Sequence, residues 1–155
     1  MTAIISVKDV ANEMDSMSDE ISSFINKRTG ELVTLSDEMF SAVEEGSDIN
    51  KYPAWQQEDI IKAKEVLESD DYLQLPSKFD IHEYHIMEEF CRAFNDSEIS
   101  NALLSKIKGR GAFSRFKEAI RRYDIENEWF EFREKELEKI AIEWLKKNHI
   151  AYTEK

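Results

Sequence analysis

The spacing of apolar residues constrains the fold of this chain more than any other feature. Along most of the sequence, apolar residues recur three or four positions apart, the period of a helix with one buried face. Between residues 21 and 35 the period changes to two, as in a half-buried strand. This alternation continues on both sides of a turn at residues 28–30 that ends in glycine. We therefore expect a β-hairpin, with Lys27 opposite Glu31.

Helix start and stop signals divide much of the remaining chain. Acidic residues after Ser36 suit the first turn of a helix that ends near Gly46, and Pro53 suits the first turn of another that runs to about Ser69. Apolar spacing also predicts a short helix over residues 6–15 and a long one over 126–147. Asn148 would adopt the left-handed conformation that ends the last helix.

Two capping boxes predict further helix starts. In this pattern, a short polar side chain at the N-cap and an acidic residue three positions later satisfy free backbone N–H groups. The pattern occurs in Asp80 with Glu83 and in Asn95 with Glu98, and the hydrophobic pair Phe79 and Tyr84 flanks the first box. A third start follows Gly111.

Together these elements predict an α+β fold that is mainly α-helical. A small N-terminal antiparallel hairpin or sheet would pack against a bundle of about five to six helices, and residues 72–75 would add a short strand to the hairpin. The chain has 155 residues with only four glycines and two prolines, so it has little room for flexible linkers. We expect a single domain over residues 1–155.

Cysteine content and hydropathy predict the compartment. Cys91 is the only cysteine, so it cannot form an internal disulfide, and this favours a reducing cytoplasm. No apolar run approaches membrane-spanning length, and the first residues lack the basic-then-apolar pattern of a secretory signal. We expect a cytoplasmic protein with no membrane contact and with Cys91 as a small buried apolar residue.

Positive charge is concentrated in residues 106–122, KIKGRGAFSRFKEAIRR, which we call the basic segment. It has seven basic residues and one acidic residue in a chain whose net charge is −12. Its two glycines suit a turn between two helices, and a helix N-terminus offers free N–H groups to anions. The segment is thus either a tight structural corner or an anion-binding site. The candidate binding residues are Arg110, Gly111, Arg115, Lys117, Arg122 and, from the last helix, Arg133.

Arg133 lies in the middle of the apolar face of the last helix. That face is formed by Trp129, Phe130, Leu137, Ile140, Ala141 and Trp144. A guanidinium there needs a carboxylate, backbone carbonyls, an aromatic plane or a bound anion, because unpaired burial costs several kcal/mol. Arg133 would either pair with an acidic residue, stack on Trp129, or reach a pocket shared with residues 109–115.

The helix-turn-helix arrangement around the two glycines also resembles a DNA-binding motif. Its second helix, residues 112–123, would present basic side chains to phosphates. At the centre of its outward face, however, it offers Ser114 and Glu118, and no Asn or Gln that could recognise adenine. The acidic remainder of the chain also repels a duplex, so these observations argue against sequence-specific DNA binding and leave a nucleic-acid binder as an alternative.

One group of residues has metal-binding spacing. His82, His85 and Glu89 project within about 60° of one another on their helix, but they lie on its polar side and no fourth ligand is evident. We expect solvated histidines, with no metal and no cofactor. The sequence contains no glycine-rich phosphate loop, nucleophile elbow or cysteine pair, and no catalytic residues are identified.

Several segments together resemble a known family. They are DEISSFINKRTGELVTLSDE near the start, FDIHEYHIMEEFC (79–91), GRGAFSRFKEAI (109–120) and ENEWFEFREKELEKIAIEWL (126–145). The chain is similar to the bacterial uncharacterised protein family numbered 0158 in the UPF series. This resemblance implies a small soluble bacterial protein built as one unit. It implies no activity and no catalytic residues.

The function that we expect is that of a non-enzymatic intracellular binding or adaptor module, whose basic segment receives an unknown protein or an anionic ligand. The helix-turn-helix-like nucleic-acid binder is one alternative, and two others remain. One is an enzyme that acts on a phosphorylated small molecule, with arginines as electrophiles and His82 or His85 as acid–base. The other is a protein whose acidic surface mimics DNA. Phe132 and Ile142 lie off the main apolar face, so the protein is expected to be a monomer or a homodimer.

Overall fold

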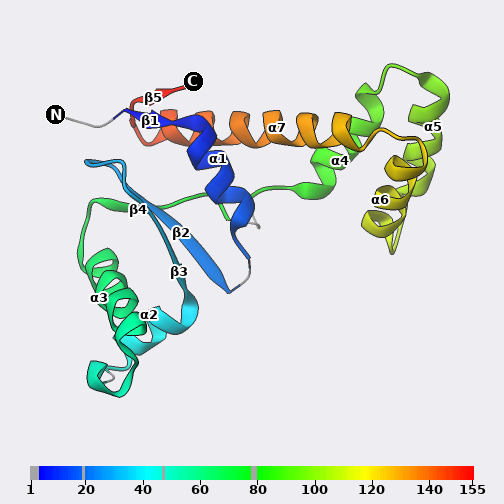
Figure 1. Cartoon of the computed structure of the whole chain (residues 1–155). Helices are drawn as coiled ribbons and strands as arrows, with labels where there is room; N and C mark the ends of the chain where they lie inside the picture. Colours follow the sequence, from blue (N-terminus) through cyan, green and yellow to red (C-terminus); the bar gives the residue numbers. More distant parts are fainter. Residues whose placement is uncertain (1–3, 19, 47, 78–79) are drawn as a thin grey trace. The chain divides into compact units, whose positions relative to one another are not determined.

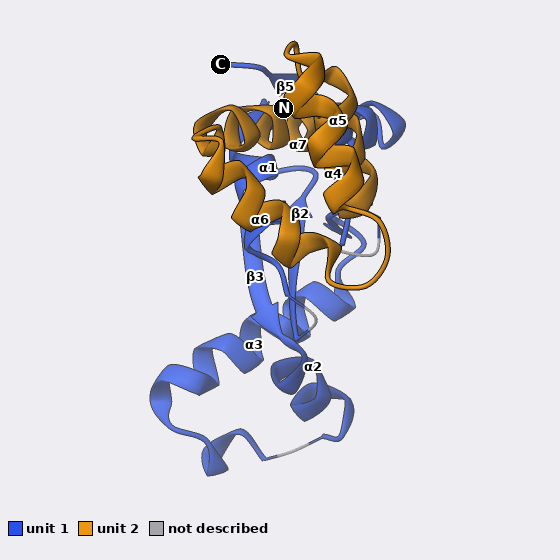
Figure 2. Ribbon diagram, turned by 90° about the vertical axis from the view of Figure 1, so that its right-hand side faces the viewer, with its two compact units in different colours: residues 1–80, 140–155 blue, residues 81–139 orange. Residues whose placement is uncertain are grey.

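The computed structural model describes residues 4–18, 20–46, 48–77 and 80–155. The chain divides into two compact units (Figure 2), residues 1–80 with 140–155 (unit 1) and residues 81–139 (unit 2). The last helix contributes residues to both. That residues 1–155 form a single domain stays a prediction, because it depends on whether the two units unfold together.

Helices dominate both units (Figure 1). The described residues contain α1 Val7–Ser16, α2 Asp37–Glu44, α3 Ala54–Glu68, α4 Glu83–Ala93, α5 Ser97–Lys106, α6 Ala112–Arg122 and α7 Glu126–Lys147, with a short 3-10 helix at Ile49–Lys51. The predicted mainly helical α+β class is confirmed, although the seven α-helices exceed the five to six expected. In the described part of the chain, no helix combines the length and the apolar character needed to cross a bilayer.

Unit 1 contains the predicted sheet. Strands β2 Ile21–Asn26, β3 Leu32–Ser36 and β4 Tyr72–Gln74 pair antiparallel in the order β3-β2-β4. This confirms the hairpin and its third strand. A second, parallel pair joins β1 Ile5–Ser6 to β5 Tyr152–Thr153. It was not predicted, because strands of two residues have no detectable period.

The register of the hairpin differs from the prediction by one residue. Ile25 pairs with Leu32, and the Asn26 N–H donates to the Glu31 carbonyl at 2.9 Å, so Asn26 rather than Lys27 lies opposite Glu31. The cause is the Asn26 side chain, whose oxygen accepts hydrogen bonds from two N–H groups of the turn, at 2.9 and 3.1 Å. Such an Asx turn lengthens the loop at its start.

The sheet and helices α2 and α3 enclose one hydrophobic core in unit 1. Its buried residues are Val33, Leu35, Met39, Ala42, Ile60, Ala63, Val66 and Tyr72. Tyr72 links this core to the surface, because its hydroxyl donates to the Glu31 carboxylate at 2.6 Å, and Lys62 donates to the same oxygen at 2.8 Å. In this part of the sheet, a cation and a carboxylate are therefore directly paired.

An aromatic cluster forms the core of unit 2, in which α4 packs against α5, and α5 against α6 (Figures 1 and 2). The Phe90 ring from α4 lies 5.3 Å from Trp129 of α7 and 6.0 Å from Phe116 of α6, measured between centroids. Phe116 and Trp129 are themselves 4.8 Å apart. These contacts fix α6 and the beginning of α7 against α4.

Three predicted helix ends are wrong in detail. His82, not Asp80, is the N-cap of α4, because the Asp80 carboxylate instead accepts hydrogen bonds from the N–H and hydroxyl of Ser77. Phe79 of the predicted hydrophobic pair lies outside the described residues.

The N-cap of α5 is Asp96 rather than Asn95, since the Asp96 side chain accepts hydrogen bonds from two N–H groups of the first turn. After α7, the left-handed residue is His149 (φ 58°) rather than Asn148.

Candidate functional site

The turn between α5 and α6 forms the centre of the basic segment. Gly109 and Gly111 both have φ of +75°, the left-handed conformation that glycine adopts without steric cost. Gly111 is also the N-cap of α6. These two residues reverse the chain within a few positions, as the sequence predicted for a corner between two helices.

Arg115 closes this turn from the first turns of α6. Its guanidinium donates to the carbonyls of Lys106 at 2.7 Å and Lys108 at 2.5 Å, and also to that of Arg110. Carbonyls at a helix C-terminus have no partner within the helix, and a cationic side chain satisfies them well. Arg115 thus holds the turn together. These hydrogen bonds fit the tight structural corner, one of the two alternatives for the basic segment. Anion binding by Arg115 stays a prediction.

The other cations of the basic segment face solvent. Six basic residues are exposed, and within the part of the chain that the structure describes none of them has a carboxylate within salt-bridge distance. They are Lys106, Lys108, Arg110, Lys117, Arg121 and Arg122. Four of the predicted binding residues, Arg110, Gly111, Lys117 and Arg122, therefore lie in an open surface with unbalanced positive charge.

Helix α6 divides these cations between two flanks. On one flank, Arg115 and Arg122 line a small hollow of about 90 Å³ together with Lys106 and Glu118. On the other, Lys117 and Arg121 follow Phe113 at four-residue steps, which places the three side chains in one row. The structure thus brings Arg115 and Arg122 together and places Lys117 on the opposite flank.

Arg133 has a carboxylate partner. Its Nη2 lies 2.5 Å from Glu83 Oε1 and its Nε donates to Glu83 Oε2 at 3.2 Å, a two-bond pair between α7 and the start of α4. Both side chains are about a quarter exposed, at 22% and 27%. Arg133 is not among the residues that line the Arg115–Arg122 hollow. Of the alternatives that the sequence left for Arg133, the structure therefore shows pairing with an acidic residue.

The histidines do not join the arginines. His82 and His85 are exposed, and neither lines the hollow of Arg115 and Arg122. Among the described residues, the group whose geometry could hold a metal ion is His85 with Glu88 and Glu89, whose possible ligand atoms lie within 4.8 Å of one another. His82 is not in this group, and Glu88 also pairs with Arg92 at 3.5 Å. The expectation of no metal stays a prediction.

Cys91 is buried within unit 2, as predicted. Burial raises the pKa of its thiol to about 11, so that the thiol is neutral at physiological pH. A neutral buried thiol is a poor nucleophile, which leaves Cys91 a packing residue.

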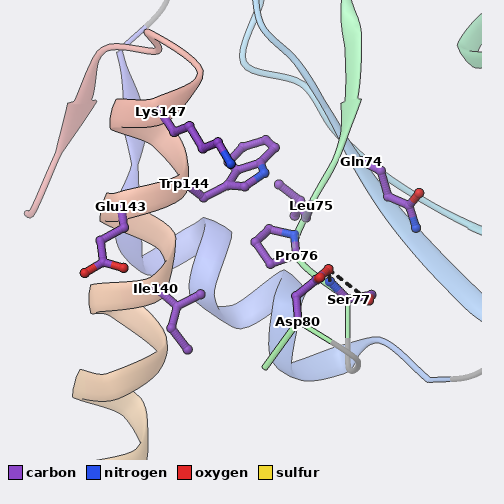
Figure 3. A pocket seen from close by; sticks show the side chains of 9 residues that line it. All are labelled: Gln74, Leu75, Pro76, Ser77, Asp80, Ile140, Glu143, Trp144 and Lys147. Carbon is purple, nitrogen blue, oxygen red and sulfur yellow. Dashed lines mark hydrogen bonds between the residues drawn. The ribbon is translucent and has the colours of Figure 1, made fainter. Parts of the chain in front are cut away.

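A larger hollow of about 520 Å³ lies in unit 1, away from the basic segment in the sequence. Figure 3 shows the Trp144 ring turned toward Leu75 and Pro76, while Glu143 points to the other side of its helix. Lys147 is its only cation among the described lining residues, beside the carboxylates of Asp80 and Glu143. This mixture of charges selects no ligand class, and so the basic segment is the stronger candidate.

Two exposed aromatic residues belong to the same surface and were assigned to other roles from the sequence. Tyr84 was placed in a hydrophobic pair at a helix start, and Phe113 in the helix predicted over residues 112–123, without a binding role. In the structure Phe113 is 46% and Tyr84 43% exposed. Their rings meet edge to face at 6.4 Å. The available signal was that Phe113 shares a row of four-residue steps with two cations, Lys117 and Arg121.

Comparison with known proteins gives a family but no activity. A search of curated proteins and of solved structures found no match. The family model described as "Uncharacterised protein family (UPF0158)" matches residues 2–155, nearly the whole chain. The protein thus belongs to the UPF0158 family, as the resemblance of its segments predicted.

Proposed function

We propose that this protein is a non-enzymatic binding module that receives an anionic partner at the basic segment. The observation that carries the proposal is the set of six exposed cations without a carboxylate partner among the described residues. Acidic residues are abundant elsewhere, at 33 in the whole chain, yet a single one lies in the segment. A cluster of like charges repels itself, and an anionic partner relieves this repulsion.

The shape of the surface supports a polymeric partner over a small molecule. The hollow of Arg115 and Arg122 measures about 90 Å³. Pockets that enclose drug-sized ligands are about 300–1,000 Å³. The cations lie on both flanks of α6 and in the turn before it, so a partner would have to extend over the surface to contact several of them. An acidic protein segment or a polyphosphorylated chain has the required length and charge.

The chemistry of the corner favours binding over catalysis. The hydrogen bonds of Arg115 hold three carbonyls, which is a positioning role. Neither histidine lines the hollow, and the buried Cys91 thiol has a pKa of about 11. A catalytic site needs a nucleophile or an acid–base group within hydrogen-bond reach of the reacting atoms. The enzyme alternative therefore has no observation in its favour.

The proposal is tested by isothermal titration calorimetry of the protein with inorganic polyphosphate at several salt concentrations. We expect Lys117→Gln/Arg121→Gln to weaken binding by roughly tenfold and to reduce the salt slope by about 1 to 2, because two phosphate contacts are lost. The matched control is Lys8→Gln/Lys64→Gln, which removes two exposed cations of unit 1.

The control double variant should bind polyphosphate like the wild type. Equal weakening of the two double variants would mean that net charge, not the basic segment, determines binding. Absence of binding by the wild type at low salt would overturn the proposal.

A further inference from the structure

We infer that the anionic partner of the basic segment is a single-stranded nucleic acid, whose bases stack on Tyr84 and Phe113 while its phosphates contact the cations of α6. This inference rests on the proposed function and goes further by naming the class of partner. It starts from the aromatic pair of Tyr84 and Phe113, which a purely electrostatic site does not require.

The aromatic pair is exposed and held in position. Tyr84 is 43% and Phe113 46% exposed, and their ring planes are 81° apart. The Tyr84 hydroxyl donates to the carbonyl of Ile107 at 2.9 Å, which anchors the ring at the α5–α6 turn. Two rings at nearly a right angle form a corner, so a flat base can stack on one ring while its edge meets the other. Because the hydroxyl is already bonded, the Tyr84 ring needs little ordering on binding.

Four cations lie close to the aromatic pair along the chain and along α6. Lys108 and Arg110 lie in the turn that Tyr84 contacts, and Lys117 and Arg121 continue the row that begins with Phe113. Successive members of that row are about 6 Å apart along the helix axis. Stacking platforms bordered by positive charge are the common arrangement in proteins that bind single strands without sequence preference.

This combination favours single strands over the other polyanions. An acidic peptide offers carboxylates to the cations but few flat rings for the aromatic pair. In a duplex the bases are stacked on each other and cannot reach the rings, and α6 presents no Asn or Gln for base recognition at the centre of its outward face. The net charge of −12 repels nucleic acid at a distance, so contact must be local and sensitive to salt.

The test compares two probes and two matched aromatic substitutions. Fluorescence anisotropy would follow a short labelled oligouridylate, and calorimetry would follow inorganic polyphosphate. Phe113→Leu keeps an apolar side chain but removes the ring. Phe130→Leu is the control, because Phe130 is 58% exposed in the same unit but lies on α7. Far-UV circular dichroism would verify that both variants fold.

We expect Phe113→Leu to weaken oligouridylate binding by about 5- to 150-fold, the effect of losing one base–aromatic stack. Its affinity for polyphosphate should change less than about twofold, and Phe130→Leu should change neither. A duplex of the same length should bind more weakly than the single strand.

The outcomes separate this inference from the proposed function. If polyphosphate binds but Phe113→Leu leaves oligouridylate affinity unchanged, or if the duplex binds more tightly, the partner is not a single strand and the basic segment binds another polyanion. If neither probe binds the wild type, both the inference and the proposed function fail.

Discussion

The sheet region of unit 1 and the basic segment of unit 2 balance positive charge in different ways. Beside the sheet of unit 1, Lys62 lies 2.8 Å from Glu31 and Arg28 lies 3.6 Å from Asp71. In the basic segment of unit 2, six exposed cations have no carboxylate partner among the described residues. The difference teaches where to look for a ligand, because the sheet pairs are complete within the chain and the basic segment is not.

Arginines within unit 2 sharpen this contrast. Arg133 is paired with Glu83, and Arg115 is bonded to three carbonyls, so both stabilise the fold. The remaining cations of the segment lie around this rigid frame. A rigid turn that presents unpaired cations loses little conformational entropy when a partner binds.

The largest expected effect is on the partly buried pair of unit 2. Arg133→Met leaves the Glu83 carboxylate, only 27% exposed, without this partner. We expect a loss of about 2 kcal/mol in the free energy of unfolding, against less than about 1 kcal/mol for Lys62→Met in unit 1, whose partner Glu31 is 46% exposed. Urea denaturation would measure both losses. Equal losses would contradict the different degrees of burial, and Glu83→Gln/Arg133→Met should recover part of the loss.

The next effect concerns the two left-handed glycines of the turn. The strain of an alanine at φ of +75° should by itself cost about 1 kcal/mol in each of Gly109→Ala and Gly111→Ala. At Gly111 the added Cβ would also lie 3.1 Å from Arg115 Nη1, whereas at Gly109 nothing lies within 4 Å. We therefore expect Gly111→Ala to cost about 1 kcal/mol more, since hydrogen bonds of Arg115 to the turn are disturbed. Similar melting temperatures for the two variants would show that Arg115 adapts freely.

A smaller effect follows from the titration of Glu31. The hydrogen bond from Lys62, and then that from Tyr72, lowers the pKa of Glu31 below its ordinary value of 4.5. A lowered folded pKa stabilises the protein above 4.5, and this contribution disappears as the pH falls through the folded pKa. Glu31→Gln should therefore be less stable than the wild type by about 0.5–1 kcal/mol at neutral pH, with the gap closing in acid. A gap that persists unchanged in acid would contradict the ionic origin.

The smallest effect is expected in the basic segment itself. Lys117→Gln/Arg121→Gln should leave the free energy of unfolding unchanged within about 0.5 kcal/mol, or raise it slightly, because no pair is lost and repulsion is relieved. Thermal unfolding would measure this. A clear loss of stability would show that these cations serve the fold, as Arg115 and Arg133 do, and would remove the contrast with the sheet pairs.

Local signals in the sequence predicted most elements of the fold. The period change at the hairpin and the glycine before α6 are signals carried by residues close together in the sequence. The bounds of α7 also agree with the predicted 126–147. The caps of α4 and α5 were displaced because several short polar residues compete for each position, and the local hydrogen bonds of Asp80 and Asp96 decide between them.

Helix α7 shows why the exposed aromatic residues were harder to predict. Phe130 was assigned to the buried face but is 58% exposed. Each residue turns the helix by about 100°. The buried Ala141 and Leu145 therefore lie about 120° and 160° around the helix axis from Trp129, which is also buried. Residues 126–139 belong to unit 2 and the remainder of α7 to unit 1, so a single helical wheel averages two different buried faces.

The site depends on contacts that are distant in the sequence. Arg133 pairs with a residue 50 positions away, and Tyr84 bonds to a carbonyl 23 positions away. Spacing along one helix cannot reveal such partners. The sequence therefore located the basic segment and named the alternatives for Arg133, while the structure was needed to separate the paired cations from the unpaired ones.

The most direct test of the central claim is NMR chemical-shift mapping of the ¹⁵N-labelled protein during titration with inorganic polyphosphate at low salt. If the unpaired cations form the binding surface, the perturbed amides should cluster in residues 106–122, with Tyr84 beside them, and should return toward their free positions as salt is added. Perturbations concentrated around Trp144 in unit 1, or no perturbation at all, would contradict it.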